Sequence, residues 1–70
     1  MTITPGIYRL SNGDTYRITR VRPDPKILYP VESDNSEVWT RDGRYFAQWV
    51  SIWDLVERVG DLPAAQRGDL

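Results

Sequence analysis

Cysteine and histidine are both absent from the 70 residues of the chain. Because no disulfide can form, the sequence suits a reducing compartment, and we expect a cytoplasmic protein. These two residue types also supply most zinc ligands and the commonest general bases and nucleophiles. We therefore expect no metal, no cofactor and no catalytic activity.

Long apolar runs are missing as well. No stretch approaches the roughly 20 apolar residues that span a bilayer as a helix. The opening residues, MTITPGIYRL, have neither the basic region nor the apolar region of a signal peptide. We expect a soluble protein that does not act at a membrane.

Neither sign of charge is in clear excess, since 9 basic and 10 acidic residues give a net charge of −1. The distribution is nevertheless uneven. Residues 9–26 carry five basic and two acidic side chains, a balance of +3, and the remaining residues carry four basic and eight acidic ones, a balance of −4. Such a dipolar surface can steer encounter with a complementary partner.

Apolar residues make up 40% of the chain, which is enough for one small core. We expect a single small domain over residues 1–60. Residues 61–70 show no periodicity, and we expect them to form a flexible C-terminal tail.

The first hairpin signal is the Asn-Gly pair at residues 12–13, which stands between two alternating runs. Such a pair favours a two-residue type I′ turn, which would place Ile7 opposite Ile18. Alternation in the second run breaks before residue 21. A bulge near Thr19 or Arg20 would restore it.

The second hairpin signal is the Asp-Gly pair at residues 42–43. The same turn type would place Trp39 opposite Phe46, an aromatic cross-strand pair. Period 2 then directs Trp39 and Trp49 to opposite faces. We expect Trp49 in the core, and Trp39 with Phe46 at least partly in a surface patch.

Between the hairpins, two prolines in RPDPK predict an extended loop. The segment ILYPVE predicts a short strand near a sheet edge because of Pro30. Residues 33–36, SDNS, predict a polar turn.

After the second hairpin, apolar residues recur at helical spacing from Ile52 to Val59. Ser51 with Asp54 resembles a capping box. Alternation through the same segment also suits a last strand, so the choice between helix and strand stays open. The fold class we expect is mainly β: a small antiparallel SH3-like barrel or curved sheet of four to five strands, with one short helix or helical turn near residues 52–59.

The chain resembles a broad group of short bacteriophage and prophage proteins in four segments: PGIYRLSNGDTYRI, YPVE, VWTRDGRYF and SIWDLVERV. The matching positions are Tyr8, Arg9, Gly13, Tyr29, Pro30, Trp39, Gly43, Asp54, Leu55 and Val56. The resemblance implies a small SH3-like fold and a phage accessory protein. Proteins of this kind often inhibit host defence, anti-CRISPR proteins among them. The partner so implied is a bacterial host protein complex, such as a nucleic-acid-guided defence effector.

Protein binding is the function class that the residues favour, because Trp, Tyr and Arg dominate interface hot spots. We expect a non-catalytic inhibitor that covers a functional surface of its partner, with acidic side chains competing for a nucleic-acid-binding groove. The predicted contact residues are Trp39, Arg41, Arg44, Phe46, Asp34, Glu37, Asp54 and Glu57. A homodimer through the same patch or an open strand edge is a related possibility.

Two alternatives stay open. A basic strip could bind nucleic acid, although the net charge of −1 weakens the counterion release that dominates such affinity. The residues of this strip are Tyr16, Arg17, Arg20, Arg22 and Lys26. The chain could also sequester a signalling nucleotide with its arginines.

Overall fold

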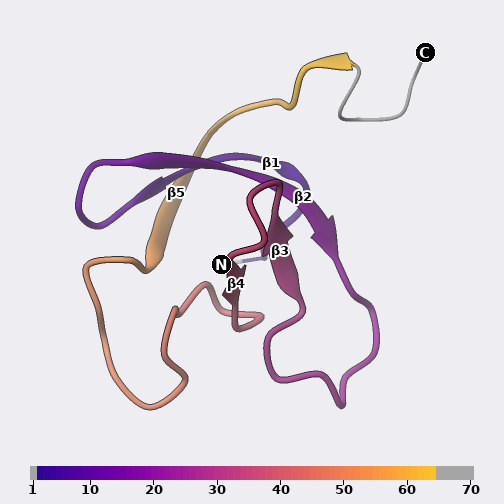
Figure 1. Ribbon diagram of the computed structural model, residues 1–70, viewed down its shortest axis with the longest axis vertical. Helices are drawn as coiled ribbons and strands as arrows, with labels where there is room; N and C mark the ends of the chain where they lie inside the picture. Colours follow the sequence, from indigo (N-terminus) through magenta and orange to yellow (C-terminus); the bar gives the residue numbers. More distant parts are fainter. Residues whose placement is uncertain (1, 65–70) are drawn as a thin grey trace.

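Five antiparallel strands form one sheet in the computed structural model, which describes residues 2–64 (Figure 1). The strands are β1 (Gly6–Leu10), β2 (Thr15–Val21), β3 (Val31–Ser33), β4 (Val38–Trp39) and β5 (Leu55–Gly60). Their order across the sheet is β4-β3-β2-β1-β5, so the first four form a meander and β5 returns to the free side of β1. The predicted mainly β fold is confirmed, whereas the sheet is not closed into a barrel.

Three tight loops, two within the meander and one directly after β4, share one hydrogen-bonding pattern. The residue before each loop donates its N–H to the carbonyl four residues on, at 2.7, 2.9 and 2.8 Å; these residues are Leu10, Ser33 and Thr40. The last residue of each loop has a positive φ angle, 96°, 73° and 89° in turn; these residues are Gly13, Ser36 and Gly43. Each loop therefore contains three residues, as in a type I turn that ends in a left-handed residue.

Both predicted two-residue loops are therefore one residue too short. In the first hairpin Ile7 pairs with Arg17, not with Ile18. A type I′ turn needs positive φ at both central residues. Among the described residues other than glycine, only Ser36 has one, so Asn12 and Asp42 do not meet that requirement.

The second hairpin also ends early. After Thr40 and Arg44 close the loop, the chain leaves the sheet, and β4 pairs with β3 alone. The predicted pairing of Trp39 with Phe46 is wrong. The Trp39 ring packs instead against Tyr45, with centroids 6.0 Å apart.

Two smaller predictions about the meander are confirmed, and one is wrong. The β2–β3 register shifts between Ile18 and Arg20, which is the expected bulge. Residues 33–36 form the expected polar turn. However, β3 is paired on both sides, so Pro30 precedes an internal strand and not an edge strand.

Of the two alternatives left open for residues 52–59, the last strand is confirmed and the helix is wrong, because residues 55–60 form β5. Ser51 and Asp54 do make local capping bonds: Asp54 Oδ2 accepts the Ser51 N–H at 3.0 Å, and Ser51 Oγ accepts the Trp53 N–H at 2.9 Å. The turn then stops. The free side of β1 offers backbone donors and acceptors to the following residues, and this pairing outweighs their helical spacing.

The core lies between the curved sheet and the loops that follow β4. Its buried members are Ile3, Tyr8, Leu10, Ile18, Val31, Trp39 and Leu55. Trp39 is 0% exposed and Trp49 is 57% exposed, so the predicted placement of both tryptophans was wrong. Trp49 lies in the connection after β4 and not on a strand, so the alternation expected through the second hairpin does not apply to it.

The predicted tail begins with described residues. Among them Leu62 is buried, with 3% of its surface exposed. The rest of the predicted tail from residue 65 lies outside the described residues.

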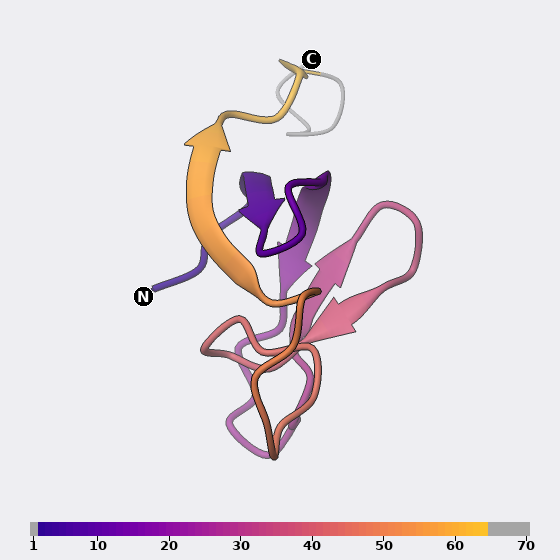
Figure 2. The same cartoon turned by 90° about the vertical axis from the view of Figure 1, so that its left-hand side faces the viewer.

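The two long connections, residues 22–30 and 44–54, lie at the same end of the molecule (Figures 1 and 2). The Ala47 N–H donates to Tyr29 Oη at 3.2 Å and joins them. The Leu55 N–H also donates to the Gly43 carbonyl at 2.8 Å, which links the loop after β4 to the start of β5. The two outer strands of the sheet thus approach each other at this end.

Candidate binding site

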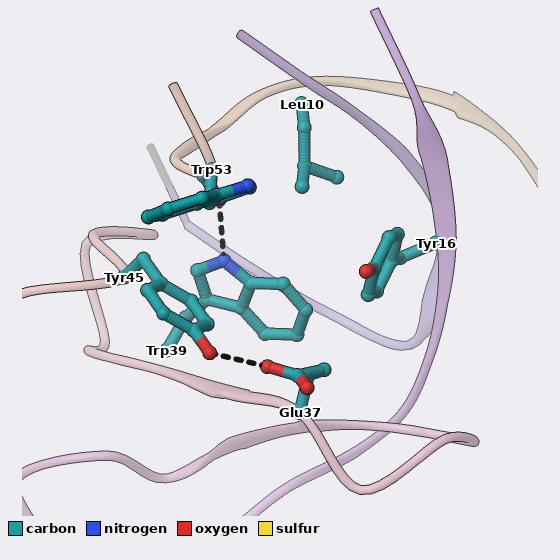
Figure 3. Close-up of a pocket in the computed structure, with 6 residues that line it drawn as sticks. All are labelled: Leu10, Tyr16, Glu37, Trp39, Tyr45 and Trp53. Atoms are coloured by element: carbon teal, nitrogen blue, oxygen red, sulfur yellow. Dashed lines mark hydrogen bonds between the residues drawn. The ribbon is translucent and has the colours of Figure 1, made fainter. Parts of the chain in front are cut away.

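A pocket of about 160 Å³ opens beside β4, between aromatic rings and one carboxylate (Figure 3). Its lining side chains are Leu10, Tyr16, Glu37, Trp39, Tyr45 and Trp53. They come from β1, β2, β4 and the connections that flank β4. The pocket therefore depends both on the meander and on the connection between β4 and β5, residues 44–54.

Trp39 forms the buried floor of this pocket. Figure 3 shows its indole between Tyr16 and Tyr45. The Tyr16 ring meets it edge-on, with centroids 5.4 Å apart and planes at 90°. The Trp39 Nε1–H donates to the Trp53 carbonyl at 2.7 Å, which satisfies the buried indole and fixes the backbone of the opposite wall.

Glu37 places the carboxylate at the pocket. Tyr45 Oη donates to Glu37 Oε2 at 2.5 Å. This hydrogen bond raises the pKa of the Tyr45 hydroxyl above its ordinary value of 10.0, and burial and the negative charge of Glu37 act in the same direction. The hydroxyl is therefore neutral at physiological pH, and it orients the carboxylate.

Asp54 fixes the far side of the site. Its carboxylate is buried and accepts two backbone N–H groups, from Tyr45 at 2.9 Å and from Ser51 at 3.0 Å. Its own carbonyl accepts the Ser11 N–H at 2.9 Å. Asp54 thus braces residues 44–54 through its side chain and links them to the first hairpin loop through its backbone carbonyl.

Residues 49–53, WVSIW, form an exposed apolar loop next to the pocket. The exposed fraction is 57% for Trp49, 74% for Val50, 58% for Ile52 and 42% for Trp53. The Phe46 ring supports both tryptophans, with centroids 5.4 Å from Trp49 and 6.1 Å from Trp53. A concentrated apolar surface of this kind on a small domain is typical of an interaction site.

The structure separates the residues predicted to contact a protein partner. Trp39 and Asp54 are buried and form the scaffold instead of the surface. The Arg41 guanidinium donates to the Arg22 and Asp24 carbonyls at 3.1 and 3.3 Å, so it holds the loop after β2.

The other predicted contact residues are scattered over the molecule. Glu37 lines the pocket, and Phe46 lies beneath the apolar loop. Glu57 pairs with Arg9 at 2.8 Å on β5. Arg44 and Asp34 are exposed on separate loops.

Sequence reasoning missed the exposed surface itself. Trp49 was assigned to the core, and Ile52 to a short helix or a last strand. The WVSIW run carried the signal, since four large apolar residues in five exceed what one face of a short element can bury.

The predicted nucleic-acid strip is divided as well. Tyr16 lines the pocket and packs on Trp39, so its ring faces the pocket and not the exposed side of the strand. Neighbouring residues of a strand face opposite sides, which turns Arg17 away from Tyr16. Arg22 pairs with Glu32 at 2.5 Å. The remaining members, Arg20 and Lys26, are exposed on β2 and on the loop after it.

Comparison with protein-family models, with curated proteins and with solved structures finds no match. The resemblance to phage accessory proteins stays a prediction. Within residues 2–64 no cluster of acidic side chains could hold a metal ion. No helix among them is long and apolar enough to cross a membrane.

Proposed function

We propose that this chain is a protein-binding module that covers a surface of its partner through the apolar loop, residues 49–53. The observation that carries the proposal is the exposure of Trp49, Val50, Ile52 and Trp53 in one short segment. Tryptophan is the residue most enriched in binding hot spots, and hot spots lie in apolar patches that become fully desolvated.

The loop is preordered for binding. Phe46 and Trp49 form an isolated antiparallel bridge, and Asp54 secures the end of the loop through two backbone hydrogen bonds. A preordered loop loses less conformational entropy when a partner immobilises it. This favours the loop as a contact surface over a mobile connection.

We propose a bacterial defence complex as the partner and inhibition of that complex as the role. This part of the proposal follows from the resemblance alone. The nucleotide-sponge alternative loses support, because a pocket of about 160 Å³ is small for a nucleotide and no arginine lines it. The nucleic-acid alternative loses the contribution of Tyr16.

We also propose that the sheet is an incomplete SH3-like barrel. The strand order, with β5 returning to β1, supports this, as does the hydrogen bond between Leu55 and Gly43 that links the two outer edges.

Affinity capture from nuclease-treated bacterial lysate tests the binding proposal. Trp49→Ala should weaken retention of the captured protein about tenfold or more, because a truncated hot-spot tryptophan costs over 1 kcal/mol. Val50→Ser and Val59→Ser form a matched pair, since both valines are exposed but Val59 lies on β5. We expect only the first to reduce capture.

Equal capture by the wild type and by Trp49→Ala would contradict a binding role for the loop. Captured material that is lost when nuclease is added would instead favour nucleic acid as the partner.

A further inference from the structure

We propose that the aromatic pocket binds a quaternary or methylated ammonium group, with Tyr16, Tyr45, Trp53 and Glu37 as its contacts. This goes beyond the proposed function, because it concerns the pocket and holds whether or not the apolar loop docks a protein. The ligand class follows from three properties of the pocket: its size, its ring geometry and its single carboxylate.

The size matches a small organic cation. A cavity of about 150 Å³ holds a benzene-sized molecule, and the pocket measures about 160 Å³. A tetramethylammonium group is similar in size to benzene. The pocket therefore accepts the head of such a cation, with the rest of the ligand leaving through the open side.

The rings form walls and do not stack. Tyr16 stands at 90° to Trp39, Tyr45 at 68° to Trp39, and Trp53 at 59° to Tyr45. Tyr16, Tyr45 and Trp53 all line the pocket, and aromatic ring faces carry the negative part of the quadrupole that attracts cations. Trp39 is fully shielded, so it positions the other rings and does not touch the ligand in this geometry.

Glu37 supplies the only formal charge among the lining residues. One of its oxygens accepts the Tyr45 hydroxyl, which holds the carboxylate at the pocket. A carboxylate next to aromatic faces favours a positive ligand over a neutral one of the same shape.

Methylated nitrogen fits better than a primary ammonium or a guanidinium. A lysine ammonium brings three N–H donors and an arginine brings five, and each donor needs an acceptor when it is removed from water. Among the lining side chains, only the Glu37 carboxylate and the tyrosine hydroxyls can accept. A quaternary ammonium has no N–H donor, so it leaves no donor unsatisfied in this pocket.

The experiment is a titration of the full chain followed by NMR of the indole N–H signals. Choline is compared with 3,3-dimethyl-1-butanol, its neutral analogue of the same shape. We expect choline to bind about tenfold more tightly than this analogue because of its charge. Equal affinity for the two compounds, or no saturable shift with millimolar choline, would overturn the proposal.

Variants locate the site. Glu37→Gln keeps an acceptor for the Tyr45 hydroxyl but removes the charge, and it should abolish most of the preference for choline. Trp53→Ala should weaken choline binding, whereas Trp49→Ala should not, since both tryptophans are exposed but only Trp53 lines the pocket. Unchanged choline affinity in both Glu37→Gln and Trp53→Ala would place binding elsewhere and refute the inference.

The same titration separates the two sources of such a group. A peptide that carries trimethyllysine should bind more tightly than choline if the ligand is a protein side chain. Tighter binding of choline would assign the pocket to a free small molecule. Either result supports the pocket chemistry.

Discussion

Ser36 is the one described residue other than glycine with a positive φ angle, 73°. It occupies the position that Gly13 and Gly43 take in the other two loops, where only glycine avoids a contact between Cβ and the backbone. Replacement with glycine removes this strain. We expect Ser36→Gly to raise the free energy of unfolding by about 0.5–1 kcal/mol, measured by urea denaturation.

The matched control is the reverse change in the first loop. A Cβ at Gly13 would meet no atom within 4 Å, so Gly13→Ser introduces backbone strain alone. It should lower the free energy of unfolding by about 1–2 kcal/mol. A neutral or destabilising Ser36→Gly would show that the loop does not have the left-handed geometry described.

The hydrogen bond between Tyr45 and Glu37 makes the free energy of unfolding depend on pH in the alkaline range. The pKa of the Tyr45 hydroxyl is raised above 10.0 in the folded protein, so the neutral hydroxyl stabilises the fold below pH 10.0. That contribution is lost as the pH rises through the raised pKa and the phenolate faces the carboxylate. We expect wild type to be more stable than Tyr45→Phe at neutral pH and to lose this advantage above pH 10.0. Urea denaturation of both proteins across this range measures it, and a constant difference would contradict the assignment.

The conformation of residues 44–54, the connection between β4 and β5, depends on Asp54 and not on a helix. Its buried carboxylate accepts the Tyr45 and Ser51 N–H groups, which would be left without partners in Asp54→Ala. We expect this variant to lose about 2–4 kcal/mol of stability. Glu57→Ala removes only an exposed ion pair with Arg9 and should cost at most about 1 kcal/mol. Similar losses in the two variants, by thermal or urea unfolding, would refute the anchoring role.

The elements of the meander could be predicted from local signals. Turn residues located all three loops, and the broken alternation before Val21 located the bulge near Thr19. Loop length could not be predicted, because glycine at position 13 or 43 serves a two-residue and a three-residue loop equally well. Each register was therefore wrong by one residue.

The last strand could be proposed from alternation but not chosen over a helix, because its partner is distant in sequence. Residues 55–60 pair with β1, roughly fifty residues earlier, and no local pattern encodes that pairing. Ser51 and Asp54 even supply genuine capping bonds, which extend no further than one turn. Local preference for a helix was real, and long-range backbone pairing outweighed it.

Across the molecule, the three tryptophans divide into a buried one and two exposed ones. Their number alone predicts that one small core cannot bury all three. Which of them is buried could not be predicted, because the strand expected after Gly43 does not form, so alternation along it says nothing about Trp49. The candidate site was thus anticipated as an aromatic surface near the second hairpin, but not in its true residues, Trp49 to Trp53.

Both proposals depend on which tryptophans are buried. The pocket needs a buried Trp39 as its floor, and the apolar loop needs an exposed Trp49. The measurement that tests it most directly is quenching of tryptophan fluorescence by iodide. The double variant Trp49→Phe, Trp53→Phe retains only Trp39, and both substitutions fall at exposed positions. We predict blue-shifted emission that iodide barely quenches, next to strong quenching of the wild type. Emission from Trp39 that iodide quenches as readily as the wild type would contradict the buried floor, and with it the pocket and the loop as described.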